Sequence, residues 1–126
     1  MSGIRVLIVD DSSVMRKIVD RSLRQAGLEI TEVIEASNGL EALARVQGAR
    51  LDLILSDINM PTMDGIELVR QAQAVENAKG VPIVMITTEA GESNVVQALS
   101  NGARGYIRKP FSPDQIRERI TPLLEG

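Results

Sequence analysis

Hydrophobic residues gather in three short runs that are apolar almost throughout, "VLIV" at 6–9, "LIL" at 53–55 and "PIVMI" at 82–86. Continuous apolar runs of this length are typical of strands buried on both faces of a sheet. Two further runs, "TEVIEA" at 31–36 and "GYIRKP" at 105–110, mix apolar and polar residues. Mixed strands suit the edges of a sheet, so we expect the three apolar strands at its centre.

Between these strands, apolar residues recur at helical spacing. Gly27, Gly48 and Gly102 follow or close three of the patterns and are plausible C-terminal stops. The predicted helices cover residues 13–27, 39–48, 65–75, 92–102 and 112–124.

The last predicted helix has distinct signals at both ends. Ser112 suits the N-cap, Pro113 the first helical position, and Gln115 the third residue after the cap, which together form a capping box. Pro122 lies inside the same pattern. Because proline lacks the N–H that a helix needs, we expect the helix to end or kink near residue 121.

Five strand–helix units in succession predict an α/β fold, a doubly wound five-stranded parallel sheet with five helices on its two faces. With right-handed crossovers, strand order 2-1-3-4-5 places the mixed strands at the edges and the apolar ones inside. This is the known order of flavodoxin-like folds. We see no linker, repeat or low-complexity segment, and expect residues 1–126 to form a single domain.

The composition narrows the chemistry. The chain has no Cys and no His, which excludes thiolate or imidazole metal sites, cysteine nucleophiles and histidine general bases. Acidic and basic residues are mixed along the chain with a net charge of −3, unlike the basic footprint of a nucleic-acid binder. No stretch has the length of a membrane span or the form of a signal peptide, so we expect a cytoplasmic protein without nucleic-acid or membrane partners.

Polar side chains stand where four predicted strands end. Asp10 and Asp11 follow the first strand, Asp57 the third, Thr87 the fourth, and Lys109 lies at the end of the fifth. The carboxyl ends of parallel strands share one edge, and ligands bind there at the switch point between strands one and three. Oxygen ligands alone favour a hard ion, Mg²⁺, Mn²⁺ or Ca²⁺. The cluster suits phosphoryl transfer, with Asp57 as nucleophile or metal ligand.

Each of these residues also has a simpler interpretation. Asp10 and Asp11 suit helix capping, and Asp57 could begin an ordinary loop. Lys109 could be a solvated surface charge, and Tyr106 could be edge packing. The coincidence of four polar strand ends with matching chemistry favours the functional interpretation.

The stretches "VDDSSVMR", "SDINMPTMDG", "TTEA" and "GYIRKPF" together resemble the receiver domain of two-component response regulators. The resemblance spans the whole chain and leaves no segment for an output domain, so it is to the stand-alone, CheY-like type. It implies a regulatory protein rather than an enzyme, one that supports its own phosphorylation and dephosphorylation.

The resemblance also implies roles for individual residues. Asp57 matches the phosphoacceptor, Asp11 the direct Mg²⁺ ligand, and Asp10 a ligand acting largely through a metal-bound water. Asn59 matches the position whose backbone carbonyl coordinates the metal. The remaining matches are the phosphoryl-binding switch residue Thr87, the phosphoryl-pairing Lys109 with its cis bond to Pro110, and the switch aromatic Tyr106.

The partners implied by the resemblance are proteins. Because the chain has no His, a histidine kinase must supply the phosphoryl group in trans. A downstream protein, with chemotaxis or motility as the candidate process, would read the face of the fourth helix, fifth strand and fifth helix. We expect a monomer and leave dimerisation on phosphorylation open.

Two positions depart from the common family pattern. Thr88 stands where a smaller residue, often Ala, is usual, and we expect its bulk to narrow access to Asp57. Arg108 adds a charge beside the predicted output face.

Two other functions are compatible with parts of the pattern. A Mg²⁺-dependent phosphohydrolase of the haloacid-dehalogenase type also uses Asp, Thr and Lys, but its signature is DxD on the first strand, whereas Asp10 and Asp11 are adjacent. A receiver that only binds partners and is never phosphorylated is the other alternative.

Overall fold

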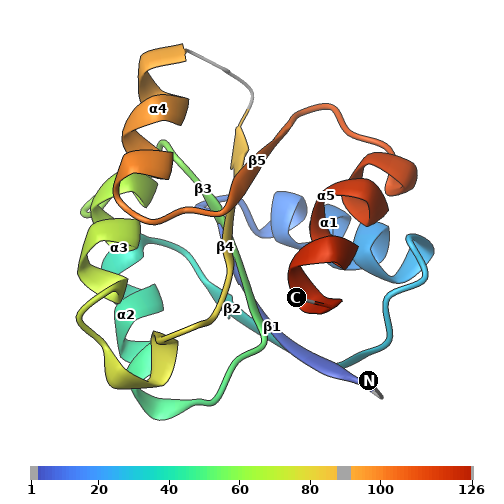
Figure 1. The fold of residues 1–126 in the computed structure, drawn as a ribbon, viewed down its shortest axis with the longest axis horizontal. Coiled ribbons are helices and arrows are strands. Elements are labelled where there is room, and N and C mark those ends of the chain that lie inside the picture. Colours follow the sequence, from blue (N-terminus) through green and yellow to red (C-terminus); the bar gives the residue numbers. More distant parts are fainter. Residues whose placement is uncertain (1–2, 88–91, 126) are drawn as a thin grey trace.

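The computed structural model describes residues 3–87 and 92–125, in which strands and helices alternate along the chain (Figure 1). The strands form a five-stranded parallel sheet in the order β2-β1-β3-β4-β5, which confirms the predicted topology. The elements are β1 (Ile4–Val9), α1 (Ser13–Gln25), β2 (Ile30–Ala36), α2 (Gly39–Gly48), β3 (Leu53–Asp57), α3 (Gly65–Ala72), the 3-10 turn η1 (Glu76–Ala78), β4 (Ile83–Thr87), α4 (Glu92–Ser100), β5 (Gly105–Arg108) and α5 (Pro113–Glu125).

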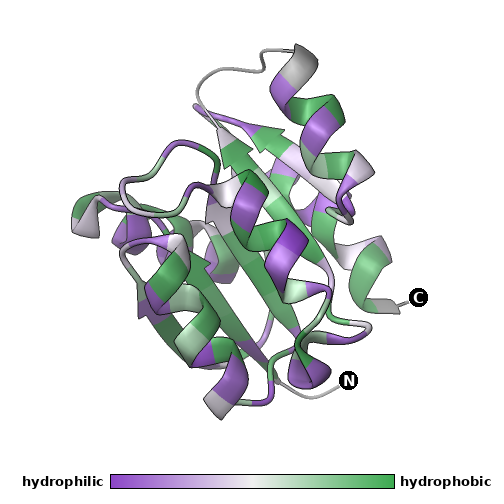
Figure 2. Ribbon diagram, turned by 90° about the vertical axis from the view of Figure 1, so that its left-hand side faces the viewer, coloured by the Kyte–Doolittle hydropathy of each residue, from purple (hydrophilic) through white to green (hydrophobic). Residues whose placement is uncertain are grey.

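Helices cover both faces of the sheet, α1 and α5 on one side and α2, α3 and α4 on the other (Figure 1). Alternate side chains of a strand point to opposite faces. In β1, Val6 and Ile8 therefore join the core under α1 and α5, while Leu7 and Val9 join the core under α2 and α3. The central strands are apolar over most of their length, as expected for burial on both faces (Figure 2).

Helical spacing alone did not separate core from surface. In α1, Val19 and Leu23 are buried, because they lie on the side of the helix that packs on the sheet. Several residues of the same apolar patterns are instead between 43% and 66% exposed, namely Val14, Ile18, Leu40, Val96 and Leu99.

The predicted helix ends are mostly confirmed. The Gln115 N–H donates to Ser112 Oγ at 3.2 Å, and the Ser112 N–H donates to Gln115 Oε1 at 2.9 Å, which completes the capping box. Helix α1 ends at Gln25, and Gly27 follows with φ of 89°, in the left-handed region that glycine tolerates.

Pro122 was predicted to end or kink the last helix near residue 121, and the predicted end is wrong. Helix α5 continues through Pro122 to Glu125. Proline removes one backbone hydrogen bond, and here it does so in the last turn of the helix. The partly buried Leu123 and Leu124 pack against the core on this side, so tertiary contacts offset that loss.

Candidate functional site

The polar residues predicted to meet do so at the carboxyl edge of the sheet. Asp10 directly follows β1, Asp57 ends β3, and Lys109 directly follows β5. One carboxylate oxygen from each of Asp10, Asp11 and Asp57 lies within 4.8 Å of the other two. The ends of β1 and β3, which are far apart in the sequence, thus bring a compact acidic cluster together.

Lys109 is the cation of this cluster. Its Nζ lies 3.1 Å from Asp10 Oδ2 and 3.6 Å from Asp57 Oδ2, and its side chain is only 10% exposed. The Lys109 N–H also donates to the Thr87 carbonyl at 2.8 Å, which fixes the end of β5 beside β4. The Lys109–Pro110 peptide is cis, as the resemblance implied. Lys109 is therefore an interior charge, not a solvated surface residue.

Asp57 is held at its backbone and at one carboxylate oxygen. The Ile58 N–H donates to Asp57 Oδ1 at 2.7 Å, while Oδ2 faces Lys109. Burial raises the pKa of the Asp57 carboxyl above its ordinary value, and the neighbouring Asp10 charge adds to the rise. Lys109 and the N–H groups of Ile58 and Asn59 act in the opposite direction. When all three carboxylates are ionised, the Lys109 ammonium balances only one of their three negative charges.

Asp10 and Asp11 occupy different environments despite being adjacent. Asp10 is buried, with Oδ1 accepting the Ser12 N–H at 2.9 Å and Oδ2 paired with Lys109. Asp11 is exposed. The side-chain cap of α1 is Ser12, whose Oγ accepts the Met15 N–H at 3.2 Å. Capping by the two acids, the simpler interpretation of this pair, is therefore not what the structure shows.

Backbone hydrogen bonds hold the loop after β3 in place near both of its ends. The Gly65 N–H donates to the Ile58 carbonyl at 2.7 Å, and the Gly39 N–H of α2 donates to the Met63 carbonyl at 3.0 Å. A Cβ on Gly65 would lie 2.1 Å from the Asp57 carbonyl oxygen, so this glycine is required for the close approach. Asn59 is exposed on this loop.

The two residues predicted to form a switch lie on neighbouring strands. Thr87 is buried at the end of β4, and the register pairs it with the exposed Arg108 of β5. Tyr106 is half-buried against the core, and the Arg119 guanidinium lies 5.7 Å from its ring centroid. Thr88, predicted to narrow access to Asp57, lies outside the described residues.

Arg16 was not among the site residues predicted from the sequence. Its Nη1 donates to the Asp10 carbonyl at 2.6 Å, and its Nε donates to Glu35 Oε1 at 2.7 Å. An available signal was its place at the fourth position of α1, where the positive end of the helix dipole disfavours a cation. A cation in such a place indicates a specific partner.

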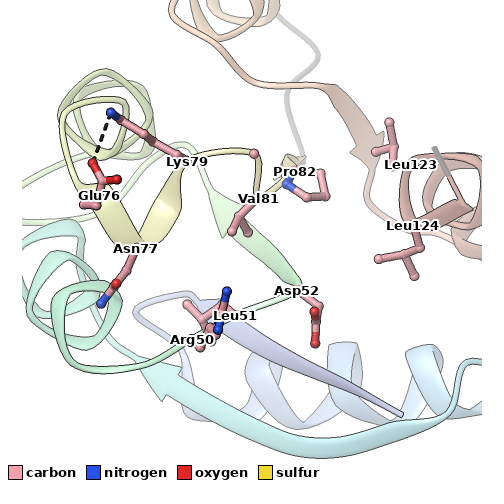
Figure 3. A pocket seen from close by; sticks show the side chains of 11 residues that line it. Arg50, Leu51, Asp52, Glu76, Asn77, Lys79, Val81, Pro82, Leu123 and Leu124 are labelled. Carbon is pink, nitrogen blue, oxygen red and sulfur yellow. Dashed lines mark ion pairs between the residues drawn. The ribbon is translucent and has the colours of Figure 1, made fainter. Parts of the chain in front are cut away.

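A pocket of about 600 Å³ lies at the opposite edge of the sheet (Figure 3). Asp52 and Pro82, which precede β3 and β4, line it together with Leu123 and Leu124 of α5. The predicted site residues do not line it.

In the part of the chain that the structure describes, no helix is long and apolar enough to cross a membrane.

Comparisons with known proteins agree with this geometry. Residues 6–121 match the response regulator receiver domain family. The chain is 40% identical over 121 residues to chemotaxis protein CheY1 of Helicobacter pylori, covering 95% of this chain and 96% of that protein. It is 39% identical over 123 residues to chemotaxis protein CheY-3 of Vibrio cholerae, covering 98% and 93%.

Solved structures of similar proteins share the fold. The chemotaxis response regulator CheY4 of Vibrio cholerae superposes with a TM-score of 0.84 at 38% identity, covering 97% of this chain and 99% of that one. The receiver domain of sensor histidine kinase PA1611 from Pseudomonas aeruginosa, which has a magnesium ion in its active-site cleft, gives 0.86 at 27% identity, covering 99% and 100%.

The fold and the acidic cluster define a class of signalling protein, and the chain belongs to the response regulator receiver domain family. Over nearly its whole length it is similar to CheY proteins. Members of this class are regulatory rather than catalytic proteins, so the phosphohydrolase alternative is set aside. The triad Asp10, Asp11 and Asp57 is a donor set typical of a magnesium site.

Proposed function

We propose that this chain accepts a phosphoryl group on Asp57 from a histidine kinase and passes the signal to a protein target. The observation that carries the proposal is the cluster itself, three carboxylates within 4.8 Å of one another with the Lys109 ammonium beside two of them. This combination suits a metal ion on one side of a phosphoryl group and an ammonium on the other.

The donor set fits Mg²⁺. It contains only oxygens, and two of its carboxylates, those of Asp11 and Asp57, are open enough to reach an ion. We assign Asp11 as the direct ligand, Asp10 as a ligand through water, and the Asn59 carbonyl as a further ligand, with Mn²⁺ as a substitute ion. When bound, the ion offsets negative charge on the phosphoryl oxygens.

The charges of the residues support this assignment. Three ionised carboxylates and one ammonium carry a net charge of about −2, which a divalent cation neutralises. The Asp10 carboxylate is already held in place by the Ser12 N–H and Lys109. The Asp57 carboxylate accepts the Ile58 N–H at Oδ1 and faces Lys109 with Oδ2.

In the transfer step, an Asp57 oxygen attacks phosphorus and forms a P–O bond as the P–N bond of the kinase phosphohistidine breaks. The bonding electron pair stays on the histidine nitrogen, which then takes a proton. Lys109 is close enough to follow the new oxygens, although it must give up part of its pairing with Asp10 to do so. Loss of the group by hydrolysis returns Asp57 to a carboxylate.

Phosphorylation changes the charge at Asp57 from −1 to about −2 and adds acceptor oxygens. Thr87 and Lys109 can interact with those oxygens only after transfer, which gives the differential interaction that a two-state switch needs. We assign Tyr106 as the aromatic that responds, and the face of α4, β5 and α5 as the surface the target reads. The exposed Val96 and Leu99 of α4 supply apolar area on that face.

We further propose that residues 1–126 act as a single receiver domain, in the cytoplasm, as a monomer in the absence of phosphorylation. The near-complete coverage of the CheY1 and CheY-3 relatives supports the first point. Because these relatives are chemotaxis proteins, chemotaxis or another motility response is the process we assign.

Mass spectrometry tests the assignment of Asp57. Incubation with Mg²⁺ and acetyl phosphate is expected to add about 80 Da, the mass of one phosphoryl group. Asp57→Asn should lose this addition, while the matched control Asp20→Asn, a partly exposed α1 acid paired with Arg24, should keep it. An unmodified wild-type mass with several phosphoryl donors would favour a receiver that only binds its partners.

A further inference from the structure

Asp10 is bonded at every polar group of its residue. Its N–H donates to the Ala36 carbonyl at 3.1 Å, and its two carboxylate oxygens are held by Ser12 and Lys109. The remaining group is its carbonyl, which accepts a hydrogen bond from Arg16 Nη1 at 2.6 Å. This carbonyl belongs to the peptide that joins Asp10 to Asp11, so its direction sets where the Asp11 side chain begins.

Arg16 is itself anchored at a second point. Its Nε donates to Glu35 Oε1 at 2.7 Å, and Glu35 lies near the end of β2, in register with Ile8 of β1. The Arg16 side chain is only 16% exposed. The planar guanidinium thus bridges the end of β2, the first turn of α1 and the peptide between the two acids, with directional hydrogen bonds.

The ion pair with Glu35 also neutralises the Arg16 charge. An unpaired cation this close to the acidic cluster would repel a divalent ion. With Glu35 beside it, Arg16 contributes hydrogen-bond geometry but little net charge. The arrangement therefore suits a residue that orients metal ligands without competing with the metal.

We propose that Arg16 is a positioning residue for the metal-binding Asp10–Asp11 segment, an inference that rests on the function proposed above. It acts through the peptide carbonyl of Asp10, not by contact with the phosphoryl group. Loss of partners that orient metal ligands typically weakens metal binding by about 10- to 100-fold.

Whether substitution of Arg16 weakens or strengthens Mg²⁺ binding distinguishes a positioning role from an effect of its charge. Arg16→Gln removes a cation and leaves the Glu35 carboxylate unpaired, so electrostatics alone predicts tighter Mg²⁺ binding. Positioning predicts the opposite, weaker binding by about 10-fold. Arg16→Lys keeps the charge but has one nitrogen for two acceptors, and positioning predicts an affinity between those of wild type and Arg16→Gln.

Isothermal titration with Mg²⁺ alone measures these affinities, and urea unfolding checks that each variant is folded. The matched control is Arg5→Gln, since Arg5 pairs with Glu32 of β2 at 2.8 Å but lies near the start of β1, far from the site. Its Mg²⁺ affinity should equal that of wild type.

Equal or tighter Mg²⁺ binding by folded Arg16→Gln overturns the inference while leaving the proposed function intact. If Arg16→Gln does not fold, Arg16→Lys decides, and an affinity equal to wild type overturns the inference. Failure of the wild-type protein to bind Mg²⁺ overturns the proposed metal site and this inference together.

Discussion

Gly65 packs closely against the backbone of Asp57, the proposed phosphoacceptor. We expect Gly65→Ala to lower the stability of the protein and to slow its phosphorylation. An added Cβ would lie 2.1 Å from the Asp57 carbonyl oxygen, 2.8 Å from Met85 Cε and 2.9 Å from Ile58 Cα. Two of these atoms are backbone, so a change of rotamer cannot relieve the clash. The loop must instead move away from β3.

The expected loss of stability follows from three contributions. Overpacking of this kind costs about 1–3 kcal/mol, and the clash with backbone argues for the upper end. Weakening the hydrogen bond from Gly65 N–H to the Ile58 carbonyl adds about 1 kcal/mol. The better helix propensity of alanine at the start of α3 returns up to about 1 kcal/mol. The net destabilisation is about 3 kcal/mol.

Urea unfolding of wild type, Gly65→Ala and Gly48→Ala measures this quantity. Gly48 is the last residue of α2, and a Cβ there would meet nothing within 4 Å, so Gly48→Ala should be neutral or more stable by up to about 1 kcal/mol. Phosphorylation by acetyl phosphate should slow in Gly65→Ala, because the Asp57 backbone shifts. Stability of Gly65→Ala within about 0.5 kcal/mol of wild type would refute the steric reasoning.

Two further predictions concern the charges of the site. Folding raises the pKa of the Asp57 carboxyl. The free energy of unfolding therefore falls as the pH rises from the ordinary pKa of this carboxyl through its raised pKa. In Mg²⁺-free buffer Asp57→Asn should therefore be more stable than wild type at pH 7, and urea unfolding should show the difference shrinking at acidic pH; a pH-independent difference contradicts this. Asp11→Ala should weaken Mg²⁺ binding in calorimetry more than Thr87→Ala does, and equal affinity in wild type and Asp11→Ala would remove Asp11 as a ligand.

The hydrophobic pattern was sufficient to predict the sheet and to place its site. Strands buried on both faces must be apolar throughout, so 53–55 and 82–86 were recognisable as central strands without any tertiary information. Once the strands are parallel and ordered, their carboxyl ends have to share an edge. Asp10, Asp57 and Lys109 were therefore predicted to meet although 99 residues separate the first from the last.

Local signals were weaker guides where tertiary contacts compete with them. Pro122 was expected to end or kink α5, but the helix continues to Glu125, and Leu123 and Leu124 of this last turn pack on the core. Ile18 has the spacing of a core residue in α1 and is 45% exposed. A helical period identifies a stripe of residues, whereas the neighbouring elements decide how much of that stripe is covered.

The sequence by itself thus determined the fold class, the strand order and the identity of the acidic cluster, because these depend on periodicity and connectivity. Only the tertiary structure distinguished buried Asp10 from exposed Asp11. It also revealed that Arg16 joins the Asp10 carbonyl to Glu35. Contacts of this kind depend on the directions of side chains from three different elements, which no single stretch of sequence encodes.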